Sequence, residues 1–120
     1  MCAETYTTEQ DFVDCFLERL PLDDPWGSSD FNVEFNYSRG KTDIVTVTED
    51  DKVVAIEAKL CKWRNALQQA YRNRCFADKS YVLLPIDAAS RALHNEREFR
   101  SRGVGICSLS EGHIKIFLTV

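Results

Sequence analysis

The segment from Val53 to Ala58 constrains the fold more than any other part of this chain, because it is almost continuously apolar. Alternate residues of a strand point to opposite faces of its sheet. A short run that is apolar at nearly every position is therefore typical of a strand that is covered on both faces. A sheet covered on both faces needs helices on each side of it. We therefore expect an α/β domain with this segment as a central strand.

Hydrophobic periodicity divides the rest of the chain into helices and strands around this segment. Three helices are predicted: one that begins after Thr8 and ends at Leu20, one over 61–77 and one over 88–101. The helix over 61–77 is expected to bury Tyr71 and expose Asn73. Further strands are predicted at Phe31–Phe35, Ile44–Thr48, Tyr81–Leu84, Val104–Leu109 and Ile114–Val120. The order α-βββ-α-β-α-ββ predicts a mixed sheet flanked by helices, in a single domain over residues 1–120.

Composition excludes several classes of protein. A hydrophobic content of 44% in 120 residues fits one folded domain and argues against disorder, and a net charge of −4 argues against a protein that coats nucleic acid with bulk positive charge. A locally basic groove remains compatible with that charge. No apolar run is long enough to span a membrane and no secretory signal precedes the domain, so we expect a cytoplasmic protein. The five cysteines show no metal-site spacing and are expected to be free thiols, mostly in the core.

Three charged residues at strand ends carry the chemistry. Glu57 and Lys59 are two residues apart on one strand, so they share a face at roughly 6.6 Å along it. Antiparallel pairing across the preceding hairpin brings Asp43 beside them. Two carboxylates suit a hard divalent cation such as Mg²⁺, and a lysine next to the cation can orient an attacking water. The alternative is structural: Glu57 pairs with Lys59 or Lys41, and Asp43 caps a turn.

The segments Gly40–Val45 and Val54–Lys59 together resemble the PD-(D/E)xK nuclease superfamily, which has the restriction-endonuclease-like fold. In that superfamily a G-x-x-D turn and strand precede an apolar strand that ends in (D/E)-x-K. A helix that often carries Gln and Tyr follows, as Ala66–Tyr71 does here. Thr42 stands where the family name places Pro, a position that varies in the family. The resemblance covers about residues 31–85.

The resemblance implies a small DNA endonuclease that depends on Mg²⁺ or Mn²⁺. Asp43 and Glu57 are then metal ligands and Lys59 is the catalytic lysine. Gln68, or Gln69 beside it, orients the water or contacts a phosphate, unless both simply lie on a solvated helix face. The alternative function is a non-catalytic member of the fold that binds nucleic acid or protein.

Some members of the superfamily add a glutamate from the first helix to the metal site. Glu9 is the best candidate for this role and Glu18 a weaker one. The alternative for each residue is the commoner one, an acid that compensates the helix dipole or lies in solvent.

Basic residues gather around the same segment and predict contacts with a DNA backbone, branched and single-stranded forms included. The alternative is ordinary charge on a helix surface. Trp63 and Tyr71 fall on the expected apolar stripe, so base stacking by them is not expected. A homodimer would present two sites to a duplex, and the strand at 114–120 is a candidate edge for it, unless it lies inside the sheet. The predicted nucleic-acid-binding residues are Arg39, Lys41, Lys62, Arg64 and Arg72.

Overall fold

The computed structural model describes the backbone of residues 6–37 and 40–119 and the side chains of residues 6–27 and 44–119. Its elements follow the predicted order, with one predicted helix divided in two. They are α1 (Glu9–Arg19), β1 (Ser28–Tyr37), β2 (Gly40–Thr48), β3 (Val53–Ala58), α2 (Trp63–Asn73), β4 (Lys79–Leu84), α3 (Ile86–Leu93), α4 (Glu96–Arg102), β5 (Val104–Ser110) and β6 (His113–Leu118).

The strands form one mixed sheet of six, in the order β1-β2-β3-β4-β5-β6. Strands β3, β4 and β5 are parallel to one another, and every other pair is antiparallel. The three parallel strands are buried along almost their whole length, as expected when both faces of a sheet are covered. Strand β6 lies at one edge of the sheet. The alternative prediction, that this strand lies inside the sheet, is therefore wrong.

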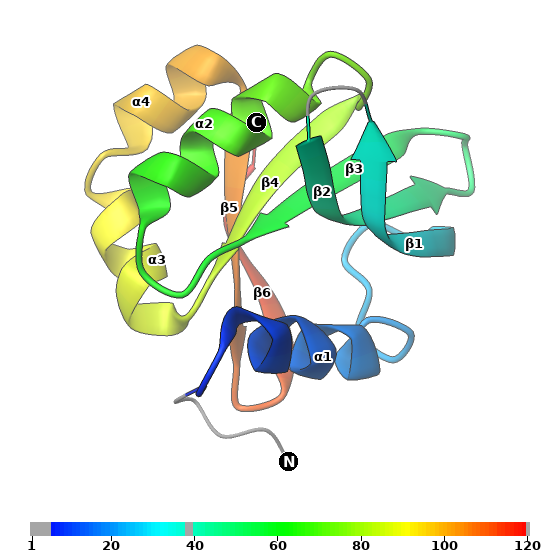
Figure 1. Ribbon diagram of the computed structural model, residues 1–120, viewed down its shortest axis with the longest axis horizontal. Coiled ribbons are helices and arrows are strands. Elements are labelled where there is room, and N and C mark those ends of the chain that lie inside the picture. Colours follow the sequence, from blue (N-terminus) through cyan, green and yellow to red (C-terminus); the bar gives the residue numbers. More distant parts are fainter. Residues whose placement is uncertain (1–5, 38–39, 120) are drawn as a thin grey trace.

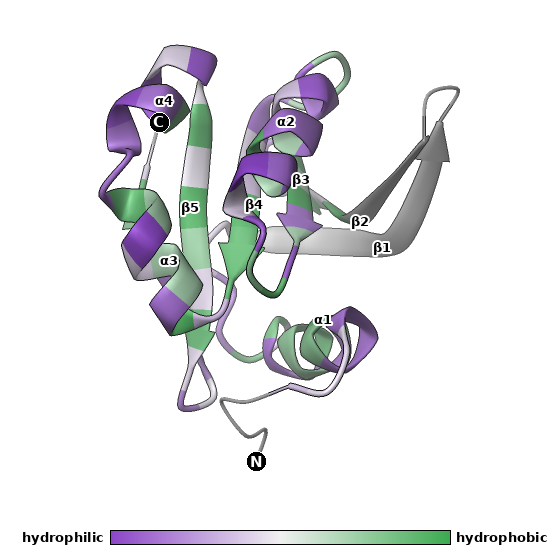
Figure 2. Cartoon of the chain, turned by 60° about the vertical axis from the view of Figure 1, so that its left-hand side comes forward, coloured by the Kyte–Doolittle hydropathy of each residue, from purple (hydrophilic) through white to green (hydrophobic). Residues whose placement is uncertain are grey.

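Helices cover the two faces of the sheet unequally. Helix α1 lies against one face, where it contacts β3 and β6, whereas α2, α3 and α4 lie against the other (Figure 1). Two hydrophobic cores result. Phe12 and Phe16 of α1 are fully buried in the first, and Ala66, Ala89 and Phe99 of the other helices are fully buried in the second. Figure 2 shows hydrophilic residues on the outer surfaces of α2, α3 and α4.

Helix α1 begins and ends where local chemistry predicts. The Thr8 hydroxyl accepts a hydrogen bond from the Asp11 backbone N–H at 3.0 Å, which satisfies one donor of the first turn. Glu9 and Asp11 place negative charge at the positive end of the helix dipole. Pro21 follows the last helical residues, as expected of a residue that cannot continue the hydrogen-bond ladder.

Helix α2 is shorter and rotated relative to its prediction. Backbone N–H groups of Arg74, Cys75 and Phe76 donate to carbonyls three residues back, so the chain tightens into a turn after Asn73. Asn73 is fully buried, whereas 51% of Tyr71 is exposed, and both predictions for these side chains are therefore wrong. The helix turns its small residues, Ala66 and Ala70, toward the sheet, and Asn73 continues that face.

The helix predicted over 88–101 is interrupted at Asn95. The Asn95 side-chain amide donates to the Arg91 carbonyl at 3.2 Å, and its backbone N–H donates to the Ala92 carbonyl at 2.8 Å. Its side chain therefore competes with the helix for backbone partners, which ends α3 and lets α4 begin in a new direction. Gly103, at φ 69°, ends α4 as predicted.

The cysteines differ from the prediction of five free thiols, because Cys15 is disulfide-bonded. Cys61 and Cys75 are free but exposed, since they occupy the chain just before and just after α2. Cys107 is the expected core thiol: burial raises its pKa, and its Sγ lies 3.4 Å from the Val82 carbonyl oxygen. Cys2 lies outside the described residues.

Candidate active site

Glu57 is a carboxylate near the end of β3, an otherwise apolar strand. Its neighbours Ile56 and Ala58 are fully buried, and Glu57 itself is only 5% exposed. Its Oε1 accepts a hydrogen bond from Asn73 Nδ2 of α2 at 3.4 Å. Because burying a charged carboxylate is costly, its position at the end of β3 calls for a compensating interaction such as hydrogen bonding or cation binding.

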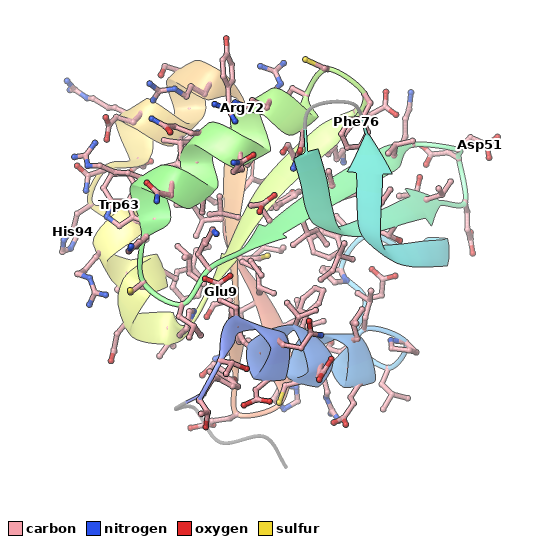
Figure 3. All side chains as sticks on the ribbon, viewed as in Figure 1. Glu9, Asp51, Trp63, Arg72, Phe76 and His94 are labelled. Atoms are coloured by element: carbon pink, nitrogen blue, oxygen red, sulfur yellow. The ribbon has the colours of Figure 1, made fainter. Side chains whose placement is uncertain are left out.

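Lys59 follows the last residue of β3 and approaches the opposite helix layer. Its backbone N–H donates to the Leu83 carbonyl at 3.1 Å, which continues the pairing with β4 beyond the strand end. Its Nζ lies 3.8 Å from Glu9 Oε1 of α1, and Figure 3 labels Glu9 at the start of that helix. The ion pair of Lys59 is thus with Glu9 of α1, and the structure brings together two of the residues predicted for the site. Glu57, however, contacts α2 on the other face of the sheet, so the side chains of Glu57 and Lys59, predicted to share a face, contact helices on opposite faces.

Asp43 belongs to β2, on the strand next to Glu57. Strand β2 pairs with β3 through Ile44 opposite Ile56, and Asp43 and Glu57 are the next residues along the two strands. The backbone register thus supports the predicted adjacency of their positions. The side chain of Asp43 lies outside the described residues, as do Arg39 and the side chain of Lys41.

The donor chemistry at this end of the sheet fits a hard divalent cation. Among the residues with described side chains, no three His, Cys, Asp or Glu form a metal-binding group. Mg²⁺ in proteins is commonly held by one or two carboxylates while waters complete its shell, so a third protein ligand is not required. Glu57 supplies one such carboxylate from a buried, ordered strand.

The two glutamines of α2 differ in their exposure to solvent. Gln69 is half-buried on the flank that leads toward Asn73, whereas Gln68 is exposed. Asn73 is the residue of α2 that reaches Glu57, and the sequence reasoning missed it. The signal that could have found it is its place one helical turn after Gln69, on the same face as the small residues of the helix.

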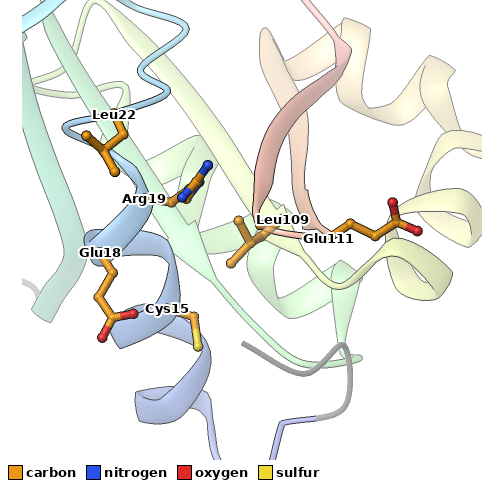
Figure 4. Close-up of a pocket in the computed structure, with 7 residues that line it drawn as sticks. Cys15, Glu18, Arg19, Leu22, Leu109 and Glu111 are labelled. Atoms are coloured by element: carbon orange, nitrogen blue, oxygen red, sulfur yellow. The ribbon is translucent and has the colours of Figure 1, made fainter. Parts of the chain in front are cut away.

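Glu18 lies two and a half helical turns from Glu9, about 13.5 Å along the axis, so α1 cannot bring both to one site. It lines a separate pocket of about 420 Å³ at the other end of α1, with Arg19 and Leu109 among its neighbours (Figure 4).

The predicted nucleic-acid-binding residues whose side chains are described lie on the surface of α2 or just before its start. Lys62 and Arg72 are exposed. Arg64 is exposed too, but its Nη1 lies 3.1 Å from Glu98 Oε1 of α4, and its guanidinium lies 4.4 Å from the Trp63 ring centroid. Trp63 in turn packs against Phe99, with ring centroids 5.6 Å apart, so Arg64 takes part in holding α2 to α4.

Comparisons with known structures give the fold a context. A protein of unknown function from Silicibacter pomeroyi is similar over 97% of this chain and 74% of its own, with a TM-score of 0.64 and 12% identity. A repair endonuclease from Pyrococcus abyssi matches 87% of this chain, with a TM-score of 0.56 and 19% identity. EndoMS in complex with double-stranded DNA matches 81% of this chain, with a TM-score of 0.53 and 15% identity. No protein-family model and no curated protein sequence matches.

The fold is restriction-endonuclease-like. At these identities the likeness concerns the fold alone, and the chain spans 48% of the Pyrococcus abyssi enzyme and 44% of EndoMS. In the part of the chain that the structure describes, no helix is both long and apolar enough to cross a membrane.

Proposed function

We propose that this protein is a small nuclease that hydrolyses phosphodiester bonds in DNA with the help of Mg²⁺ or Mn²⁺. The observation that carries the proposal is the buried carboxylate of Glu57 near the end of the central strand β3, with Lys59 as the first residue after that strand. The likeness of the fold to that of an endonuclease over 87% of the chain supports it, and so does the position of Asp43 on the neighbouring strand.

Glu57 and Asp43 would hold the cation in this proposal. A bound divalent ion lowers the pKa of a water and stabilises negative charge on a phosphate. Asn73 donates to Oε1 of Glu57 and so orients this carboxylate. Glu57 is held from two sides, by its strand and by α2, which fixes the geometry that a cation needs.

Lys59 would orient the attacking water or stabilise the charge that develops on the phosphate. Its Nζ is held by Glu9, at 3.8 Å, and both side chains are partly exposed. A partly exposed ion pair is weak, so a phosphate can compete for the lysine at small cost. We propose that Glu9 positions Lys59, with direct cation binding by Glu9 as the role implied by the family resemblance.

DNA is the proposed substrate because nucleases share this fold and EndoMS binds double-stranded DNA. The net charge of −4 is reduced to −2 by one divalent ion, which weakens the repulsion of a phosphate backbone. The exposed Lys62 and Arg72 are the proposed backbone contacts with described side chains.

Cleavage of labelled linear, branched and circular DNA with Mn²⁺ tests the proposal. We expect wild-type protein to cut at least one of these substrates and Glu57→Gln, Asp43→Asn and Lys59→Met each to lower the rate by 100-fold or more, roughly the effect of losing a group that stabilises the transition state. Glu18→Gln is the matched control, because it removes an acid at the far end of α1 and should leave the rate unchanged.

Circular dichroism must show that each variant keeps its fold. Wild-type protein that binds DNA but cuts none of these substrates would contradict the proposal and favour a non-catalytic binding module.

A further inference from the structure

Tyr71 is an aromatic side chain displayed on the surface of the molecule. It is 51% exposed on the outer side of α2, and the other exposed large hydrophobic residue among those described is Leu22. A single exposed apolar residue needs no explanation by itself. What distinguishes Tyr71 is the chemistry of the residues around it.

A shallow pocket of about 340 Å³ surrounds the tyrosine, lined by Tyr71, Arg72, Arg74 and Cys75. Both arginines are exposed, and neither forms an ion pair with a described carboxylate. Arg74 Nη1 donates to the Arg102 carbonyl at 2.8 Å, which uses one of its five N–H donors and holds its guanidinium in place. The pocket is therefore aromatic and positively charged, with no acid among its lining residues.

An aromatic ring flanked by arginines matches the chemistry of single-stranded nucleic acid. Bases stack on exposed aromatic side chains, and guanidinium groups bind the phosphates between them. The base pairs of an intact duplex keep their faces inside the stack, so a tyrosine on a convex helix surface reaches only a base that is unpaired or terminal. A carboxylate-rich peptide would use the arginines but would gain nothing from the ring.

We propose that Tyr71, Arg72 and Arg74 bind a single-stranded stretch of nucleic acid, with an unpaired base stacked on Tyr71. The inference rests on the proposed nuclease function and names its substrate class. A base-stacking role reverses the expectation that Tyr71 belongs to the apolar stripe of its helix, because that expectation assumed a buried ring.

The position of this surface links it to the candidate active site. Asn73 lies two residues after Tyr71 in the last turn of α2, and it contacts Glu57 from the inner side of the helix. A helix is about 10–12 Å in diameter, so a strand that passes around half of it covers about 16–19 Å. At about 3.4 Å per stacked nucleotide, roughly five nucleotides cover that path. A single strand that leaves the active site thus reaches Tyr71 within a few nucleotides.

Fluorescence anisotropy with a labelled 20-nucleotide oligothymidylate, in EDTA so that no cleavage occurs, tests the proposal. We expect Tyr71→Ala to weaken binding by about 5- to 150-fold, the range of one lost base-stacking contact, and Tyr71→Phe to bind as wild type does. Arg72→Gln should reduce the slope of log affinity against log salt by about 0.7. Leu22→Ala, which removes the other exposed large side chain, should change nothing.

Two results would overturn the inference. One is equal affinity of wild type and Tyr71→Ala for the oligonucleotide, and the other is its displacement by polyglutamate as readily as by unlabelled strand. The outcome is separable from that of the proposed function. Binding through Tyr71 without any Mn²⁺-dependent cleavage would uphold the surface and reject the nuclease, whereas cleavage that depends on Glu57 but not on Tyr71 would do the reverse.

Discussion

At the scale of single residues, the contact between Glu57 and Asn73 decides what the end of β3 can do. The carboxylate is nearly inaccessible, and the amide that donates to it is fully buried. Hydrogen bonds to charged groups are stronger than those between neutral groups. Removing one buried partner leaves the other desolvated without a hydrogen bond, which costs its full desolvation free energy. Asn73 therefore contributes both to stability and to the orientation of Glu57.

Replacing Asn73 with Ala should lower the free energy of unfolding by about 1–3 kcal/mol, because it removes a donor from a buried carboxylate. It should also weaken Mn²⁺ binding by about 10- to 100-fold, as loss of a residue that orients a metal ligand does. Urea denaturation measures the first effect and isothermal titration calorimetry the second. Asn65→Ala, at an exposed position on the same helix, is the control and should change neither. Unchanged Mn²⁺ affinity in a destabilised Asn73→Ala protein would assign Asn73 a purely structural role.

At the scale of elements, strands β4, β5 and β6 pack so closely around Gly105 that a larger side chain has no room there. A Cβ on Gly105 of β5 would lie 2.5 Å from the ring of Tyr81 on β4 and 2.6 Å from the backbone oxygen of Leu118 on β6. Both distances are shorter than atoms tolerate, and the oxygen belongs to a backbone that cannot move aside as a side chain can. The three strands therefore require glycine at this position.

Gly105→Ala should lower the free energy of unfolding by about 2–3 kcal/mol, at the upper end of what overpacking costs. Adding Tyr81→Ala should not restore the loss, since the Leu118 oxygen remains. Thermal or urea denaturation measures both. Gly27→Ala is a useful contrast: its Cβ would meet nothing within 4 Å, so only the positive φ of 63° opposes the substitution and the loss should be about 1 kcal/mol. Equal losses at the two glycines would argue against the clash.

Sequence periodicity predicted the elements well and their faces less well. The apolar run Val53–Ala58 appeared as β3 with the predicted bounds, because burial on both faces leaves a pattern that local sequence displays directly. The orientation of α2 was wrong at Tyr71 and Asn73, because hydropathy favours a buried tyrosine over a buried asparagine. The partner that makes Asn73 acceptable inside, Glu57, is sixteen residues away and on another element. Such polar pairs are set by tertiary packing and leave no periodic signal.

At the scale of the whole molecule, the candidate site joins layers that are otherwise separate. Glu57 contacts α2 on one side of the sheet and Lys59 contacts α1 on the other. The two hydrophobic cores lie on opposite faces of the sheet, and the end of β3 contributes Ile56 and Ala58 to the first while Glu57 contacts Asn73 of α2, the helix that covers the other face. A ligand bound here should therefore stabilise the complete fold and not one layer alone.

Mn²⁺ at 100 times its dissociation constant should raise the free energy of unfolding by about 2.7 kcal/mol, which for a chain of this size is a rise in Tm on the order of 10 °C. Differential scanning calorimetry measures the shift, and matched ionic strength separates it from screening. Glu57→Gln should abolish the rise, whereas Glu18→Gln, the control at the far end of α1, should retain it. The same rise in Glu57→Gln would place the cation elsewhere.

The docking of α1 against β6 has a consequence for how the chain is made. Phe12 and Phe16 share a core with Leu109 and Ile114, and the Ile114 N–H donates to Asp23 Oδ2 at 3.0 Å. The ribosome synthesises about 5–20 residues per second, so roughly 5–20 s separate the two partners of this core. During that interval the apolar side of α1 lacks the part of its core that Leu109 and Ile114 supply, and a nascent chain stalled before β6 should be a good substrate for chaperones.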